Sequence, residues 1–474
     1  MTIARIRQAI IVAELLTGCS TVNDIDACDY RLEPERTING RPEGEQFTQG
    51  AAALAPMPGG RAFVVFQSSS DERVGERYEH STSLRGALLD SNADRLETCG
   101  AVNEFTYAEL GEEDNEVQRR WPTIAAPVSP GDDGLLVWTK VATKEGIADE
   151  NSAVQIEGQF FDADGCPYLS TFAINTKTNF LPESPAVIAV GGGEFVVVWA
   201  ENYKYTARIR ARVVAVSSAG AKFLPVTDPE TQRPTEGEAV TLFSQGMHLQ
   251  VVSVGISGGS IAVAWRVLAP VSHTYLQVMD KRLEPQGPLV HVARDESPVV
   301  PASYHDFALA YDETHLLAAW VSRRSDGDQA IFGALVTSDG QVVRGGVGAP
   351  WELAENAQVH RNEVAVTSLP QGGFAVAWSE LAHQGERDES GSRVRMTVLD
   401  PAGDTRFNSL ACDRDAFDVN TLRAGDQRGV ELTTTTEGSL VMVWTDSGAR
   451  ELNARMRAEL RGRAIWIDRL LPTE

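Results

Sequence analysis

The fold of this chain is decided by one short stretch, Gly192-Gly193-Glu194-Phe195-Val196-Val197-Val198-Trp199, in which a glycine turn leads into an apolar strand that ends in an aromatic residue. An apolar strand that ends in an aromatic residue occurs seven times, at Phe66, Trp138, Trp199, Trp265, Trp320, Trp378 and Trp444, and a glycine-containing turn precedes it in six of the seven repeats. Successive endings are 55 to 72 residues apart. A supersecondary unit reused at such a period must stack on its neighbours to bury its faces.

Each repeat predicts four strands. A small apolar strand precedes the glycine turn, as in 185–190, and the strand ending in the aromatic follows it. After a longer connection comes a third strand with alternating apolar residues, as in 209–216, and then a turn and a weaker fourth strand. Seven such units predict an all-β fold, a seven-bladed β-propeller of four-stranded antiparallel blades over 47–474. One short helix is expected within 104–120.

Closure of the predicted ring has two alternatives. With 454–460 as the third strand of the last unit, 464–470 could serve as its outer strand. Alternatively, a segment from 29–40 crosses over and completes the last blade.

Units 2 and 3 carry a family resemblance. The residues Val154-Gln155-Ile156-Glu157-Gly158-Gln159-Phe160-Phe161-Asp162-Ala163-Asp164-Gly165, taken with Gly192 to Trp199, resemble a repeat of large secreted and surface proteins of bacteria. In that family a Gly-Gly-Phe-Val-Val-x-Trp strand accompanies a Phe-Asp-x-x-Gly strand and turn. The resemblance implies a propeller-like, export-associated module and implies no activity.

The N-terminus predicts export and a lipid anchor. Arg5 and Arg7 precede an apolar stretch at 8–16 that is too short to span a bilayer. Leu16-Thr17-Gly18-Cys19 then resembles the lipobox of bacterial lipoproteins, which implies a signal peptide at 1–18 and a lipidated Cys19. Residues 19–46 are polar and predict a tether. A cytosolic terminus with an incidental cysteine is the alternative.

We therefore expect a protein anchored in the bacterial cell envelope, with the propeller in the periplasm or outside the cell. Ser20 favours the outer membrane. The cysteines Cys28, Cys99, Cys166 and Cys412 are consistent with two disulfides in any of three connectivities, or with free buried thiols. The net charge of −24 argues against a nucleic-acid partner. A monomer is expected, and no metal site or cofactor is predicted.

The connections differ between the two faces of the predicted ring. Those after the first and third strands are short and glycine-rich, whereas those after the second and fourth strands are long: 67–83, 100–121, 139–153, 266–274, 344–361, 379–393 and 413–429. Loops on a rigid scaffold commonly carry binding. The candidate ligand-face aromatics are Tyr78, Tyr107, Trp121, Tyr203, Tyr304 and Trp351. The seven repeat aromatics are instead expected to pack between blades, and Asp162 and Asp164 to form turns.

Signals for catalysis are weak, and no catalytic residue is predicted. Arg208, Arg210 and Arg212 share one face of a strand, but one strand cannot supply a convergent site. The sequence therefore favours a binding or scaffold module for a protein or polysaccharide on the long-loop face. The alternative is an extracellular glycoside hydrolase or polysaccharide lyase, which two carboxylates ~5–10 Å apart over the central funnel would indicate.

Overall fold

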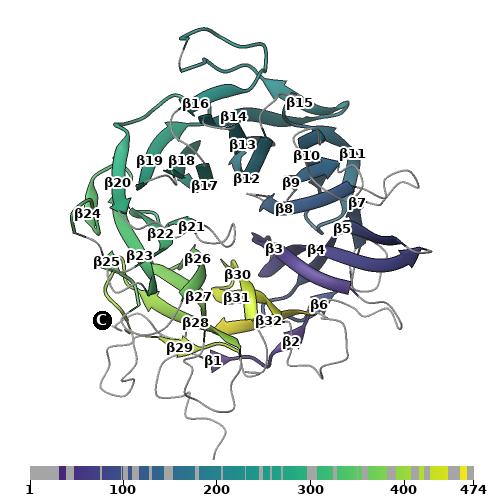
Figure 1. Ribbon diagram of the computed structural model, residues 1–474, viewed down its shortest axis with the longest axis vertical. Coiled ribbons are helices and arrows are strands. Elements are labelled where there is room, and N and C mark those ends of the chain that lie inside the picture. Colours follow the sequence, from purple (N-terminus) through teal and green to yellow (C-terminus); the bar gives the residue numbers. More distant parts are fainter. Residues whose placement is uncertain are drawn as a thin grey trace, which may run out of the picture.

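The computed structural model describes residues 31–466 apart from 39–46, 75–76, 98, 100–104, 109–116, 128–130, 143–152, 177–180, 204–205, 230, 245–248, 257–258, 268–270, 296–306, 324–327, 350, 355–360, 382–390, 407–415, 421–426 and 447–458. The named elements in this part of the chain are all strands, and they form seven antiparallel sheets arranged in a ring (Figure 1). The predicted seven-bladed β-propeller is confirmed. Within the described ranges, no helix is long and apolar enough to cross a bilayer.

Each blade begins at the ring axis and ends at the rim. Blades 1 to 3 consist of β3 (Phe47–Met57), β4 (Arg61–Val74), β5 (Arg77–Leu89), β6 (Arg95–Leu96) and β7 (Phe105–Ala108); β8 (Val117–Ala125), β9 (Gly134–Ala142), β10 (Ala153–Phe161) and β11 (Pro167–Ala173); and β12 (Leu181–Gly191), β13 (Glu194–Tyr203), β14 (Thr206–Ser217), β15 (Gly220–Leu224) and β16 (Val240–Ser244). Blades 4 and 5 consist of β17 (Leu249–Ile256), β18 (Ser260–Val267), β19 (Ser272–Asp280) and β20 (Val290–Asp295); and β21 (Phe307–Tyr311), β22 (His315–Arg323), β23 (Gln329–Thr337), β24 (Val342–Arg344) and β25 (Trp351–Glu352).

Blades 6 and 7 consist of β26 (Arg361–Ser368), β27 (Phe374–Leu381), β28 (Ser392–Leu399) and β29 (Phe417–Asp418); and β30 (Gln427–Thr434), β31 (Ser439–Asp446), β32 (Glu459–Trp466), β1 (Arg31–Leu32) and β2 (Arg36–Thr37). In blades 1, 3, 5 and 7 the fourth position is shared by two short strands that both pair with the third strand.

The N-terminal strands close the ring. Both β1 and β2 pair antiparallel with β32, with Arg31 opposite Trp466 and Thr37 opposite Arg461. The crossover alternative is therefore correct. The prediction that 454–460 is the third strand was wrong, as was the assignment of 464–470 to an outer strand, because β32 extends through residues 459–466. The predicted tether, 19–46, thus contains two strands of blade 7.

Apolar clusters fill the seven gaps between adjacent blades. Each repeat aromatic lies in the cluster that its blade shares with the preceding blade, and each is at most 4% exposed. Phe66, for example, packs with Val441 and Leu460 across the junction of blades 1 and 7. The prediction that these aromatics pack between blades is confirmed.

Two segments predicted as non-sheet structure are strands. The predicted loop 67–83 belongs to β4 and β5, which stay paired from Ala62 opposite Leu89 to Val74 opposite Arg77. The expected helix within 104–120 was wrong for the described residues of this region, because 105–108 form β7 and 117–120 begin β8. Residues 104 and 109–116 lie outside the described part of the chain. Both segments are polar, and cross-strand backbone pairing satisfies their amides without an apolar face.

The direction of the strands separates the two faces of the ring. The turns from first to second and from third to fourth strands lie on one face, here called the tight-turn face. The connections from second to third strands and from one blade to the next lie on the other, the long-loop face. In the tight turn after β10, Asp162 Oδ1 accepts hydrogen bonds from the backbone N–H groups of Asp164 and Cys166, at 2.9 Å each. The turn-forming role predicted for Asp162 is confirmed.

Ring closure can be tested at Ile38, directly after β2. Ile38 is fully buried in the cluster between blades 1 and 7, and its N–H donates to the Leu460 carbonyl at 2.8 Å. Ile38→Ala is expected to lower the free energy of unfolding by ~2–5 kcal/mol, because it leaves a cavity in the closing interface. Val343→Ala, at a residue 54% exposed, is the control and should change stability by less than ~0.5 kcal/mol. Equal losses of unfolding free energy for the two variants in chemical denaturation would contradict the role of Ile38 in closing the ring.

Candidate functional site

A hollow at the ring axis, here called the central channel, is lined by residues from the innermost strand of every blade. Figure 1 shows these strands arranged around the axis. The hollow has a volume of about 290 Å³. Aliphatic side chains dominate the wall, with a few polar ones among them. The partly exposed lining residues include Leu54, Trp121, Thr123, Val252, Leu309, Val366 and Glu431.

The channel wall is distorted near the long-loop face, where the inner strands begin. In five blades the inner strand shifts its register against the second strand at this level. Such bulges re-aim side chains and are common beside functional sites. Trp121, Ser184 and Glu363 lie at three of these shifts with φ of 54°, 48° and 56°. A non-glycine residue in this left-handed region costs ~1–3 kcal/mol, so the surrounding sheet must hold it there.

Trp121 is the predicted aromatic that reaches the channel. It is half-buried, it lines the hollow, and it lies at the register shift of β8. The Arg120 guanidinium carbon is 5.9 Å from the centroid of its ring, within the range of a cation–π contact. The bulge thus presents a large, partly accessible aromatic surface at the mouth of the channel.

The other predicted aromatics are not brought to this site. Trp351, in β25, packs on the apolar cluster between blades 5 and 6, and the Arg344 guanidinium carbon lies 4.4 Å from its ring centroid. Tyr78, Tyr107 and Tyr203 lie in strands β5, β7 and β13, but their side chains are outside the described part of the structure. Tyr304 also lies outside the described residues.

Two acidic side chains lie close to the channel mouth and differ in their surroundings. Glu363 is buried, and its Oε2 accepts hydrogen bonds from the Gly429 N–H and, at 3.3 Å, from the Ser379 hydroxyl. Glu363 therefore ties the bulge of β26 to that of β30. Glu431 is half-buried and is the one acidic residue among the described residues that line the channel.

The cysteines are described in part. Cys99 and Cys166 form a disulfide that joins the segment after β6 in blade 1 to the tight turn after β10 in blade 2. Cys19, Cys28 and Cys412 lie outside the described residues.

The arginine row of β14 is engaged within the sheet. Arg208 Nε lies 2.6 Å from Glu201 Oε2, and the Arg210 guanidinium donates to the Thr241 hydroxyl at 2.7 Å. Arg212 donates to the Gly237 carbonyl at 2.6 Å. As expected from their position on a single strand, the three side chains do not converge on a ligand site.

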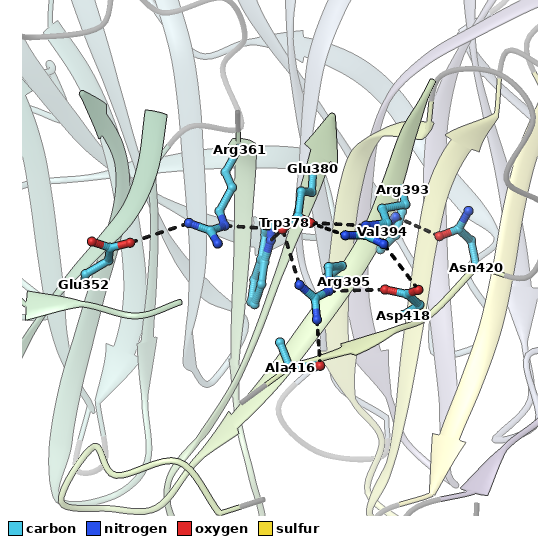
Figure 2. A network of polar contacts seen from close by, with 10 residues as sticks. All are labelled: Glu352, Arg361, Trp378, Glu380, Arg393, Val394, Arg395, Ala416, Asp418 and Asn420. Atoms are coloured by element: carbon cyan, nitrogen blue, oxygen red, sulfur yellow. Dashed lines mark hydrogen bonds and ion pairs between the residues drawn. The ribbon is translucent and has the colours of Figure 1, made fainter. Parts of the chain in front are cut away.

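Blade 6 contains a buried charge network that the sequence analysis missed (Figure 2). Glu380, fully buried in β27, is contacted by arginines from the strands on both sides, β26 and β28. Its oxygens lie 3.4 Å from Arg361 Nε, 2.7 Å from Arg393 Nη2 and 3.6 Å from Arg395 Nη1. The Trp378 indole N–H also donates to Glu380, at 3.3 Å.

The network extends to both edges of blade 6. Arg361 lies 3.5 Å from Glu352 of blade 5, and Arg395 lies 3.2 Å from Asp418 in β29 (Figure 2). A related pair occurs in blade 3, where the Trp199 indole N–H donates to Glu201 at 3.0 Å. The signal was therefore present in the sequence as Trp-x-Glu, with arginine following on the third strand. The network packs inside the blades and is not part of the channel wall.

Electrostatics in the network favour the ionised form of Glu380. Burial alone raises the pKa of this carboxyl, but Arg395 and Arg393 outweigh burial, and the net pKa is lowered. The described residues contain no group of three or more histidine, cysteine, aspartate or glutamate side chains placed to hold a metal ion.

Comparisons with known proteins return structural similarity alone. No protein-family model and no curated protein matches the chain. A protein of unknown function from Dyadobacter fermentans is 12% identical, with 92% of this chain and 99% of that chain covered and a TM-score of 0.46. The NanB sialidase from Streptococcus pneumoniae is 8% identical, with coverages of 94% and 73% and a TM-score of 0.45. The GH93 α-L-arabinofuranosidase of Fusarium graminearum is 8% identical, with coverages of 92% and 98% and a TM-score of 0.43.

The charge network predicts a pH-dependent stability. Glu380→Gln should lower the free energy of unfolding by ~3–5 kcal/mol near neutral pH, because it removes the buried counter-charge that Arg361, Arg393 and Arg395 share. Since the folded-state pKa is lowered, the stabilisation by Glu380 is present above the unfolded pKa and is lost as pH falls through the folded pKa.

Denaturation curves between neutral and acidic pH measure both effects. The difference in the free energy of unfolding between wild type and Glu380→Gln should become smaller as the pH falls. Asp404→Asn is the control, because Asp404 forms an exposed ion pair with Arg344 and should contribute at most ~1 kcal/mol. A difference in unfolding free energy that stays constant with pH would contradict the stabilising role of the ionised Glu380 carboxylate.

Proposed function

We propose that the protein is an exported, lipid-anchored β-propeller that binds a protein or polysaccharide partner at the channel mouth on its long-loop face. One observation carries this proposal: five of the seven inner strands are bulged at that mouth, and one bulge presents Trp121 to the channel. The aromatic and aliphatic wall suits an apolar side chain of a protein or the face of a sugar ring.

The disulfide supports the exported location. Cys99 and Cys166 are bonded across a sequence separation of 67 residues. Disulfides persist in oxidising compartments and are rare in the cytosol of mesophiles. The bond therefore agrees with the signal peptide and lipobox expected at 1–19.

Ring closure supports a particular orientation on the membrane. The first described strand, β1, starts opposite Trp466 at the end of β32, which is the tight-turn end of blade 7. A chain anchored at Cys19 has 12 residues to reach Arg31, at most ~3.6 Å each or roughly 43 Å in all. Because the tether joins the ring at its tight-turn end, the proposed anchor favours an orientation with the tight-turn face toward the bilayer and the long-loop face free for a partner.

Binding is favoured over catalysis by the channel wall. Glycosidases with two catalytic carboxylates place them ~5–10 Å apart around the scissile bond. Glu431 is the one acidic side chain among the described residues that line the channel. Glu363, the other acid near the mouth, is buried and bonded to Gly429 and Ser379. The alternative, a glycoside hydrolase or polysaccharide lyase, would therefore need a second accessible acid from connections such as 382–390, outside the described residues.

The binding proposal is tested with the mature domain on a glycan array and in pull-downs from envelope extract. Trp121→Ala should weaken binding of the captured partner by ~30-fold or more, because a central aromatic anchor contributes ~2 kcal/mol or more. Glu437→Ala, an exposed change in a tight turn of blade 7, is the control and should leave binding unchanged. Equal binding by wild type and Trp121→Ala would refute the channel-mouth site. Release of reducing sugar ends from an array glycan would favour the hydrolase.

A further inference from the structure

Two histidines lie side by side at the outer edge of blade 4. His273 is on β19 and His291 is on β20, and His273 Nδ1 lies 3.1 Å from His291 Nε2. Their ring centroids are 5.1 Å apart. The residues are 18 positions apart in the chain, so only the pairing of the two outer strands brings them together. Neither residue belongs to the channel wall.

An aromatic frame holds the two imidazoles in place. The Tyr275 ring stacks on His291 with centroids 5.0 Å apart and an interplanar angle of 24°. Tyr275 is in turn packed on Phe243 and Trp265, with centroid distances of 5.8 and 6.0 Å. These rings belong to the apolar cluster between blades 3 and 4. Metal-ligating side chains that a packed scaffold already holds in place lose little conformational freedom when they bind an ion.

We propose that His273 and His291 form a binding site for a late first-row divalent cation such as Zn²⁺ or Cu²⁺. Imidazole nitrogens bind these ions at ~2.0–2.1 Å. Two adjacent nitrogen donors are then ~2.9 Å apart in square-planar geometry and ~3.4 Å apart in tetrahedral geometry. The observed separation of 3.1 Å falls between these values.

The tautomers of the two rings suit coordination, because the nitrogens that face each other are His273 Nδ1 and His291 Nε2 and each ring has a second nitrogen that can carry its proton. In the apo protein one ring can donate its N–H to the other. On metal binding that ring changes tautomer: its facing nitrogen gives up the proton to solvent and its second nitrogen takes one up, so both facing nitrogens offer a lone pair and no net proton is released.

The remaining coordination positions are open. Because no third described histidine, cysteine, aspartate or glutamate joins the pair, water or a group from a partner would complete the sphere. Arg294, the cross-strand neighbour of His273, disfavours a bare cation. Its charge favours a metal that carries an anionic ligand such as hydroxide or a carboxylate.

The site is tested by titrating the mature chain with ZnCl₂ in a calorimeter, with MgCl₂ as the ion that imidazole does not select. His273→Ala and His291→Ala should each abolish the strongest Zn²⁺ isotherm. The control is His315→Ala, which removes a half-buried histidine bonded to Thr314 on blade 5 and should leave the isotherm unchanged. Thermal melting checks that each variant folds, and His273→Gln and His291→Gln replace any alanine variant that does not.

A readout on the unmodified chain complements the variants. With one equivalent of Cu²⁺, electron paramagnetic resonance of the wild type should show hyperfine coupling to two imidazole nitrogens. Absence of Zn²⁺ binding by the wild type would overturn the proposal. An unchanged isotherm in the His273 or His291 variants, or copper bound without two nitrogen ligands, would overturn it as well.

Discussion

The structure depends on the pairing of two short N-terminal strands with β32. Without β1 and β2 the last blade would expose an unpaired edge, and the gap between blades 1 and 7 would lose Ile38. The fit there is close, since a Cβ at Gly462 would lie 2.8 Å from Ile38 Cδ1. Closure makes the channel continuous, because each blade supplies one strand to its wall. It also sets the face at which the chain joins the ring, since Arg31 lies opposite Trp466 at the tight-turn end of β32.

The blades are held together by two kinds of interaction, apolar packing between neighbouring blades and buried ion pairs within some of them. Apolar clusters with one repeat aromatic each fill the gaps between neighbours, which is the role that a repeat architecture requires. Within blade 6, a carboxylate surrounded by arginines replaces part of the apolar packing, and a similar pair occurs in blade 3. Such buried charges add little net stability but penalise any arrangement that separates them. The two proposed binding sites lie at the channel mouth and at the rim of blade 4.

Much of the fold could be predicted from the sequence because one pattern repeats. The strands that end at Trp199 or Trp378 have an apolar face on each side, and only stacked blades bury both. Segments without that pattern were misjudged: 67–83 and 104–120 are polar, and their pairing with a neighbouring strand leaves no hydrophobic signature. Within the candidate site, Trp121 was predicted from its position beside a long connection. The bulge that aims it and the His273–His291 pair depend on cross-strand register, which a single sequence does not reveal. The Glu380 network left a signal in the sequence, Trp-x-Glu followed by arginine on the third strand, but the contacts among these side chains again depend on register.

We propose that closure by β1 directs the tight-turn face toward the membrane and the channel mouth away from it. Energy transfer from a site-specific fluorophore to an acceptor lipid in vesicles carrying the lipidated protein tests this most directly. Unnatural amino acids can place the fluorophore at Glu437 in a tight turn or at the exposed Arg323 at the long-loop end of β22, leaving the cysteines intact. We expect stronger transfer from position 437 than from position 323, and none from a Cys19→Ala chain that stays off the vesicles. Equal or reversed transfer in a membrane-bound protein would contradict the orientation, whereas a Cys19→Ala chain that still binds vesicles would contradict the anchor.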